Sequence, residues 1–347
     1  MNNLGILIET ARQAQGMTQA ELAQRLGVQQ ASIHRYEKGT RSPDTETLTR
    51  IGEVFGWSSR FVASASRPEG AIAVDAHLRR RATARPTVWR QLEATLNMHR
   101  LHAEFLAESV SVQSSRAIPS LDPVDATPQE AARVTRMQWR IPIGPVRDLV
   151  GWLESAGCPV IGQDMGTSRV DGLSQWSADL PLVMYNTSAP VDRVRWTLAH
   201  ELGHLVLHRR EVPVEVEDQA NAFAAEFLMP EAVIRPQLRN FTLGSALDLK
   251  QEWGVSVQAL VLRAHDLGVI DHAQRTRLYK QISYRQWRIR EPGSDSLAPE
   301  TPRLLRAIRE QMSDLGLTDD EIAEAAGFLG SSRNTLMPAP ARRLHSI

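Results

Sequence analysis

The chain has 347 residues, more than one ordinary hydrophobic core holds, so we expect two or three domains. Hydrophobic residues make up 42% and charged residues 23% of the sequence, as in globular proteins, and no apolar run approaches the ~20 residues of a membrane-spanning helix. Lysine plus arginine and aspartate plus glutamate each total 40, which leaves no overall charge to attract nucleic acid, so any DNA binding must come from a local surface.

Two further features bear on compartment and metal chemistry. The N-terminus, MNNLGILIETARQAQG, lacks the basic and apolar regions of a secretory signal, so we expect a cytoplasmic protein that does not engage membranes. Cys158 is the single cysteine, which excludes an internal disulfide and a zinc site made of cysteines. A metal ion would therefore need histidine and carboxylate ligands.

Residues 1–66 are predicted to form a domain of short helices separated by Gly, Ser and Pro. Thr18 can cap one helix, Glu21 completes a capping box, and Gly27 marks a short turn before the next helix. The free face of that next helix carries side chains able to read base edges in the major groove, and its neighbours suit phosphates. The predicted base-reading residues are Gln29, Gln30, Ser32 and Arg35, and the predicted phosphate-binding residues are Gln19, Lys38, Thr40 and Arg41.

The pieces TQAELAQRLGV and SIHRYEKG, followed by Pro43, closely resemble the helix-turn-helix domains of the lambdoid-repressor or XRE family. The resemblance implies a five-helix domain in which the second helix of the motif is the recognition helix. A helical bundle used for dimerisation or peptide binding is the alternative. Because the charge of the domain is nearly balanced, we expect a homodimer that binds a two-fold double-stranded DNA operator.

Residues 67–127 are predicted to be a helical connector and linker. Within them, 71–108 has the spacing of an amphipathic helix, whose buried stripe would include Leu92, Leu96 and Leu101, with Trp89. The stretch 111–127 is rich in Ser, Pro and Asp and has no periodicity, as expected for a linker.

The rest of the chain is predicted to mix helices with a few strands. Residues 128–240 would form an α+β domain, 241–330 a helical C-terminal region and 331–347 a disordered tail. The fold class is therefore α+β and predominantly α. The predicted helices of the α+β domain are 129–139 and 145–155, and its predicted strands, apolar runs bounded by Gly, Pro and Asn, are 158–161 and 180–185.

The strongest chemical signal is WTLAHELGHLVLH, which places His200 and His204 four residues apart with Glu201 between them. Positions i and i+4 lie on one face of a helix, so both imidazoles can bind one ion while Glu201 faces a water beside it. Zinc bound by three protein ligands activates water and polarises a peptide carbonyl, and the glutamate accepts the proton of the water. This pattern predicts a metallopeptidase with Glu201 as its general base, and a chance pair of buried histidines is the alternative.

A third ligand is needed. His208 continues the same stripe, but the helical rise places it ~12 Å along the axis from His200, too far for both to bind one ion. Glu217 begins a second helical segment, EDQANAFAAEFLMP, and is the predicted ligand. Asn221, one turn further on, could hold a ligating histidine through its free ring nitrogen. The alternative ligands are Glu215, Asp218 and Glu226.

Several neighbouring features allow weaker predictions. The run 180–185 could be the edge strand with which an extended substrate pairs, and Tyr185 could then donate to the oxyanion, with a core tyrosine as the alternative. Gly203 would allow another segment to approach the histidine helix closely. The segment LKQEWGVSVQALVLRAHDLGVI has helix-turn-helix-like spacing but few basic residues, so we expect it to pack against the peptidase.

Residues 131–291 resemble the ImmA/IrrE family of zinc peptidases fused to XRE domains. The resemblance lies in IPIGPVRDLVGWLESAGCPV, in the histidine segment with the residues before it, in EDQANAFAAEFLMP and around QWRIREP. It implies a thermolysin-like zincin fold in which the carboxylate of an E-x-x-A-N pattern, here Glu217, completes the site. It also implies cleavage of a repressor or antitoxin in a phage, mobile-element or stress response. Gln219 stands where many relatives carry another acid.

The leading hypothesis is thus a DNA-binding regulator with a zinc-dependent endopeptidase domain. An operator-binding repressor or antitoxin whose zinc site is structural or sensory is the alternative, and it predicts tight DNA binding without proteolysis. A non-peptidase hydrolase that uses the same zinc chemistry is a third reading.

Overall fold

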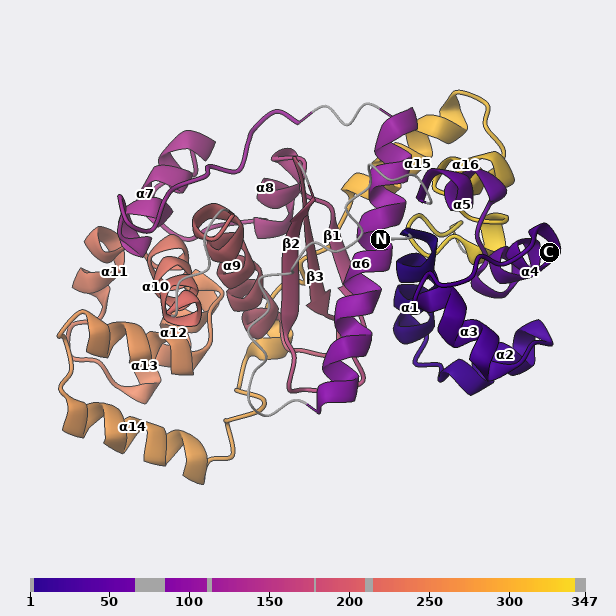
Figure 1. The fold of residues 1–347 in the computed structure, drawn as a ribbon. Coiled ribbons are helices and arrows are strands. Elements are labelled where there is room, and N and C mark those ends of the chain that lie inside the picture. The colour runs from indigo at the N-terminus through magenta and orange to yellow at the C-terminus, as the bar shows by residue number, and fades with distance from the viewer. Residues whose placement is uncertain (1–2, 66–84, 111–113, 178, 210–214, 341–347) are drawn as a thin grey trace, which may run out of the picture. The chain divides into compact units, whose positions relative to one another are not determined.

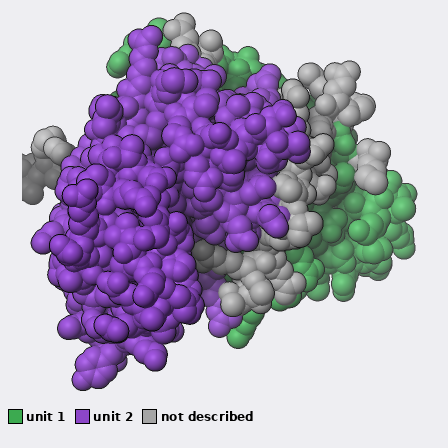
Figure 2. Space-filling model, turned by 90° about the vertical axis from the view of Figure 1, so that its left-hand side faces the viewer, with its two compact units in different colours: residues 1–76, 82–113, 303–347 green, residues 77–81, 114–302 purple. Residues whose placement is uncertain are grey.

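The computed structural model describes residues 3–65, 85–110, 114–177, 179–209 and 215–340. No helix in these ranges is long and apolar enough to cross a membrane. The chain divides into two compact units, coloured separately in Figure 2. Unit 1 comprises residues 1–76, 82–113 and 303–347, and unit 2 comprises residues 77–81 and 114–302. The chain therefore leaves unit 1, forms most of unit 2 and then returns to unit 1.

The described elements are mostly helices, with one small sheet in unit 2 (Figure 1). Unit 1 contains α1 (Asn3–Ala14), α2 (Gln19–Leu26), α3 (Gln30–Glu37), α4 (Thr45–Phe55), α5 (Ser59–Ala65), α6 (Pro86–Ser109), α15 (Leu304–Asp314), α16 (Asp319–Ala325) and η2 (Ser331–Arg333). Unit 2 contains α7 (Pro128–Trp139), α8 (Leu149–Ser155), β1 (Val160–Gln163), β2 (Gly172–Ser177), β3 (Leu180–Asn186), α9 (Val191–Leu207), α10 (Val216–Leu228), α11 (Glu231–Gln237), α12 (Leu243–Trp253), α13 (Val257–Asp266), α14 (His272–Tyr284) and η1 (Ser294–Ser296). The predicted α+β, predominantly helical class is confirmed.

The first five helices form by local rules that the sequence makes visible. The capping box of Thr18 and Glu21 is present at the start of α2. The Thr18 side chain accepts from the Glu21 backbone N–H, and the Glu21 carboxylate accepts from the Thr18 backbone N–H. Gly27 ends α2 in the left-handed conformation (φ 65°), which glycine adopts without a Cβ clash. The turn between α2 and α3 is therefore tight, as a helix-turn-helix requires.

Helix α6 belongs to unit 1, where it packs along α1. It begins at Pro86, and the N-terminal part of the predicted connecting helix, 71–108, falls within residues 66–84, which lie outside the described part. Leu92, Leu96 and Leu101 are buried as predicted, whereas Trp89 is only partly buried. Proline suits the first turn of a helix because it lacks the N–H that would have no partner there.

The C-terminal helices also belong to unit 1. His102 of α6 stacks between Phe61 of α5 and Phe328, with ring centroids 4.2 and 3.9 Å away, and its Nδ1 lies 2.8 Å from the Ala326 carbonyl. The predicted helical region 241–330 is divided between the two units, because residues up to 302 belong to unit 2 and residues from 303 belong to unit 1. Residues 331–340 of the predicted tail are ordered against the unit, with Met337 1% exposed, and residues 341–347 lie outside the described part.

Unit 2 contains a three-stranded sheet in the order β1-β3-β2. Strand β3 is parallel to β1 and antiparallel to β2, so β3 is central and the prediction that 180–185 forms an edge strand was wrong. Strand β2 was not predicted, because half of its residues are polar. Ser174 and Trp176 of β2 satisfy their polar groups on α9, which packs on the sheet, so these two polar side chains can be buried.

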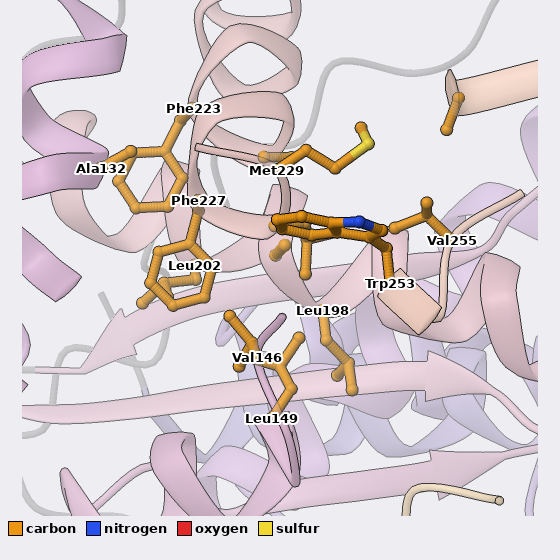
Figure 3. Packing of buried hydrophobic residues seen from close by; sticks show 14 of the residues in the cluster. Ala132, Val146, Leu149, Leu198, Leu202, Phe223, Phe227, Met229, Trp253 and Val255 are labelled. Carbon is orange, nitrogen blue, oxygen red and sulfur yellow. The ribbon is translucent and has the colours of Figure 1, made fainter. Parts of the chain in front are cut away.

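The core of unit 2 joins the sheet to α7, α8, α9, α10, α12 and α13. Figure 3 shows the Trp253 indole among apolar side chains that include Met229, Val255 and Leu198. Helices α12 and α13 thus pack in this core, as expected for the segment with helix-turn-helix-like spacing.

The predicted linker, 111–127, has no helix or strand in its described part, but it is bound to unit 2. Leu121 N donates to Val206 O at 2.9 Å, and Trp139 Nε1 donates to Ala117 O at 2.8 Å. Residues 114–127 are therefore a surface loop of the unit, and residues 111–113 lie outside the described part.

Candidate metal centre

Helices α9 and α10 lie against each other and supply the candidate ligands. Gly203 lies at their contact: a Cβ built there would be 3.2 Å from Ala220 Cα and 3.2 Å from the Phe223 side chain. The missing side chain therefore sets how closely the two helices approach, as the sequence predicted. This approach brings Glu217, at the start of α10, to the histidines of α9.

Three donor atoms from the two helices gather at one point. His200 Nε2 and His204 Nε2 are 3.0 Å apart, and the Glu217 carboxylate lies 3.6 Å from each nitrogen, through Oε2 and Oε1 respectively. Two atoms bound to one tetrahedral zinc ion at ~2.0–2.1 Å are roughly 3.3 Å apart. The donor set, two imidazoles and a carboxylate, and its spacing therefore fit one zinc ion.

The charges of the three groups are coupled. Burial lowers the pKa of His200, but the carboxylates of Glu217 and Glu201 outweigh this and raise the pKa above its usual value. Burial raises the pKa of Glu217, but its contacts with His200 and His204 outweigh this and hold the pKa well below its usual range. A negative carboxylate held beside two imidazoles is the electrostatic arrangement that a divalent cation would find favourable.

Two contacts orient the groups around this point. His200 Nδ1 lies 3.0 Å from Asn221 Oδ1, so an Nδ1–H would donate to the amide oxygen and leave Nε2 free to bind a metal. Ser174 Oγ donates to Glu201 Oε2 at 2.6 Å, and both residues are buried. The structure thus places Asn221 where the sequence predicted it. The contact of Ser174 with Glu201 was missed because β2 was not recognised.

None of the alternative ligands Glu215, Asp218 and Glu226 is grouped with the two histidines in the described part of the chain. Glu226 is buried and bonded to Arg263, with Arg133 3.3 Å away. Asp218 lines a cavity of about 610 Å³, and Asn221 and Thr197 also line it. Of the acids considered, Glu217 is the one grouped with the two histidines among the described residues.

Tyr185 is a buried residue of the sheet. A Cβ built at Gly162 would be 2.9 Å from the Tyr185 hydroxyl, which places this hydroxyl over β1. Burial raises the pKa of Tyr185, and the charges of Glu300 and Glu154 add to the effect. These neighbours are those of a core tyrosine, and the oxyanion role stays a prediction.

A buried charge cluster beside the site was also missed. Lys250 of α12 is 0% exposed and binds Asp192 at the start of α9, Glu291 at 2.9 Å and Ser294 at 3.0 Å. Glu291 in turn accepts from the Val257 backbone N–H at the start of α13. The cluster therefore ties the start of α9, which leads into the histidine segment, to α12, α13 and the 291–294 loop.

Two family models match this sequence. A helix-turn-helix model matches residues 8–61 in unit 1, and a model described as IrrE N-terminal-like domain, of peptidase family M78, matches residues 153–265 in unit 2. The chain contains both domains. The resemblances inferred from the motifs are thereby confirmed, and the second unit holds a domain of metallopeptidase type.

The sequence is also similar to the HTH-type transcriptional regulator ImmR of Bacillus subtilis (strain 168). The two are 33% identical over 60 residues, which cover 17% of this chain and 47% of ImmR. The chain therefore matches about half the length of this relative.

The helix-turn-helix domain presents most of the predicted DNA-contacting residues at its surface. Gln29, Gln30, Arg35, Lys38, Thr40 and Arg41 are exposed, whereas Ser32 and Gln19 are partly buried. Gln19 Nε2 donates to Glu37 Oε2 at 2.7 Å, and the Arg12 guanidinium also donates to the buried Glu37 carboxylate. Glu37 thus fixes the orientation of Gln19 at the start of α2, and sequence reasoning missed this role.

Proposed function

We propose that this protein is a cytoplasmic DNA-binding regulator whose IrrE N-terminal-like domain is a zinc-dependent endopeptidase. Its substrate would be a protein of the repressor or antitoxin type, cleaved in a stress, phage or mobile-element response. The main support is that His200, His204 and Glu217 converge from two helices at the spacing of a zinc ligand set, with Glu201 beside them.

The residues around this point suit hydrolysis of a peptide bond. When bound, zinc would supply the positive charge that activates a water and polarises the scissile carbonyl. Glu201 would accept the proton of the attacking water and pass it to the leaving amine. Ser174, which donates to Oε2 of Glu201, would hold the carboxylate so that Oε1 faces the water. Strand β2, at one edge of the sheet, would pair with the extended substrate.

The test compares purified, zinc-loaded full-length protein with its Glu201→Gln variant on candidate repressors. Loss of a general base lowers the rate by about 10²–10⁴-fold, whereas the ligands and zinc content stay unchanged. Glu252→Gln, an exposed glutamate of α12, is the matched control and should cleave like the wild type. Equal cleavage by the Glu201→Gln variant would refute the assigned base. Zinc bound tightly without any cleavage would favour a structural or sensory site.

We also propose that the helix-turn-helix domain binds an operator as a homodimer, with α3 in the major groove. Gln29, Gln30, Ser32 and Arg35 would contact base edges, and Gln19, Lys38 and Arg41 would contact phosphates. Each phosphate contact adds to the salt dependence of binding, so Lys38→Ala, which removes one such contact, should reduce the slope of log K against log salt by about 1. Arg35→Ala should instead weaken discrimination between operator and random DNA by ~1–3 kcal/mol.

A further inference from the structure

The second ring nitrogen of His204 points away from the candidate zinc position and meets another histidine. His204 Nδ1 lies 3.0 Å from Nδ1 of His208, the residue that follows the last turn of α9. On its other side, His208 Nε2 lies 2.8 Å from Oε1 of Gln219, two residues after Glu217 on α10. His204 and His208 are buried, with His208 0% exposed. A line of hydrogen bonds therefore runs from the metal centre through His208 to Gln219.

The direction of each hydrogen bond in this line follows from the chemistry of the groups. A neutral His204 that binds metal through Nε2 has its proton on Nδ1 and must donate it to His208 Nδ1. His208 Nδ1 must then be bare, so the proton of a neutral His208 lies on Nε2. There it meets the Gln219 amide oxygen, which can only accept. The opposite tautomer of His208 would direct two N–H groups at each other in a buried site.

We propose that His208 and Gln219 are positioning residues that hold His204 in its zinc-binding tautomer and ring orientation. The inference rests on the zinc site of the proposed function. Gln219 acts only through His208, and His208 acts only through His204.

The experiment measures the zinc affinity of the full-length protein by competition with a chromophoric chelator, which does not depend on peptidase activity. His208→Phe keeps a ring of similar size and removes the acceptor of His204. Loss of such an outer partner typically costs 10–100-fold in metal affinity, and that is the expected result. Gln219→Leu should cause a smaller loss. Gln281→Leu, at an exposed position of α14, is the matched control and should bind zinc like the wild type.

The double variant separates a relay from a general loss of packing. If Gln219 acts through His208, then His208→Phe with Gln219→Leu binds zinc as weakly as His208→Phe alone. Additive losses would overturn the relay. Because His208 is fully buried, a variant there can also lose stability, so a second measurement uses the unaltered protein. Long-range ¹H–¹⁵N NMR of the zinc-loaded, histidine-labelled protein should show His208 protonated on Nε2 and not on Nδ1. A His208 protonated on Nδ1 would overturn the proposal.

The outcomes also separate this proposal from the proposed function. If the wild type binds zinc and both single variants bind it equally well, the relay is overturned and the zinc peptidase stands. If the wild type binds no zinc, the metal centre and the relay are both overturned.

Discussion

Replacing Lys250 with methionine should unfold unit 2 at much lower denaturant concentration. Methionine fits the space of the side-chain stem, but it leaves Asp192 (2% exposed) and Glu291 (6% exposed) without the ammonium group between them. Removing one partner of a buried ion pair costs about 3–5 kcal/mol, because the remaining charge is neither hydrated nor neutralised. With ~4 kcal/mol lost and a urea m value of ~2.5 kcal/mol/M, the midpoint of unfolding should fall by ~1.5 M.

Tryptophan fluorescence in urea suits this measurement, because six of the eight tryptophans lie in residues 114–302, Trp57 and Trp89 being the two in unit 1. Lys280→Met, on the exposed face of α14, is the matched control and should stay within about 0.5 kcal/mol of the wild type. Adding Glu291→Gln to Lys250→Met removes one of the two unpaired buried carboxylates and should restore part of the lost free energy of unfolding. An unchanged midpoint for Lys250→Met would refute the view that the buried charges depend on this lysine.

Three further predictions concern single contacts. Burial lowers the pKa of His102 to about 3, against ~6.5 in the unfolded chain, so its contribution to the stability of unit 1 is present above pH 6.5. The free energy of unfolding should therefore fall by ~1.4 kcal/mol per pH unit as the pH falls from 6.5 towards 3. Unfolding curves recorded at a series of pH values should show a weaker pH dependence in this range for His102→Phe. The exposed His34→Phe is the control and should keep the wild-type dependence. Ser174→Ala removes the donor to Glu201 and should lower kcat by about 10-fold with zinc affinity unchanged; an unaltered kcat would show that Ser174 does not orient the base. Gly203→Ala crowds the α9–α10 contact and should cost ~1–3 kcal/mol and weaken zinc binding, whereas Gly244→Ala, whose nearest neighbouring atom is 3.7 Å away, should do neither.

The candidate metal-binding motif could be predicted because its residues are close in sequence. His200, Glu201 and His204 follow from helical spacing alone, and Glu217 follows from the start of the next helix together with the family pattern. Their partners were harder to find, because a side chain on one element is matched to another only after the elements pack. Ser174 lies on a strand that is half polar and lacks the alternation of apolar and polar residues by which a strand is recognised. Its contact with Glu201 exists only because β2 packs on α9.

The same limit applies to the fold. Lys250 lies in a helical segment, LDLKQEW, whose charged residues suggest a solvent-exposed face. The two acids that neutralise Lys250 are 58 and 41 residues away in the sequence. The position of α15 and α16 in unit 1 could not be predicted either. It depends on Phe328 meeting His102 across more than two hundred residues, and local patterns hold no information about such a contact.

The return of the chain to unit 1 has a consequence for synthesis on the ribosome. Helices α1–α6 are made first, but the Phe328 ring that completes their stack with His102 is translated only after the whole of residues 114–302. At ~5–20 residues per second, these roughly 190 residues take on the order of 10–40 s to make. Unit 2, with the candidate metal centre, can therefore fold on the nascent chain before α15 and α16 of the helix-turn-helix unit have been made. A transcript truncated before codon 303 would yield a peptidase domain joined to an unfinished DNA-binding unit.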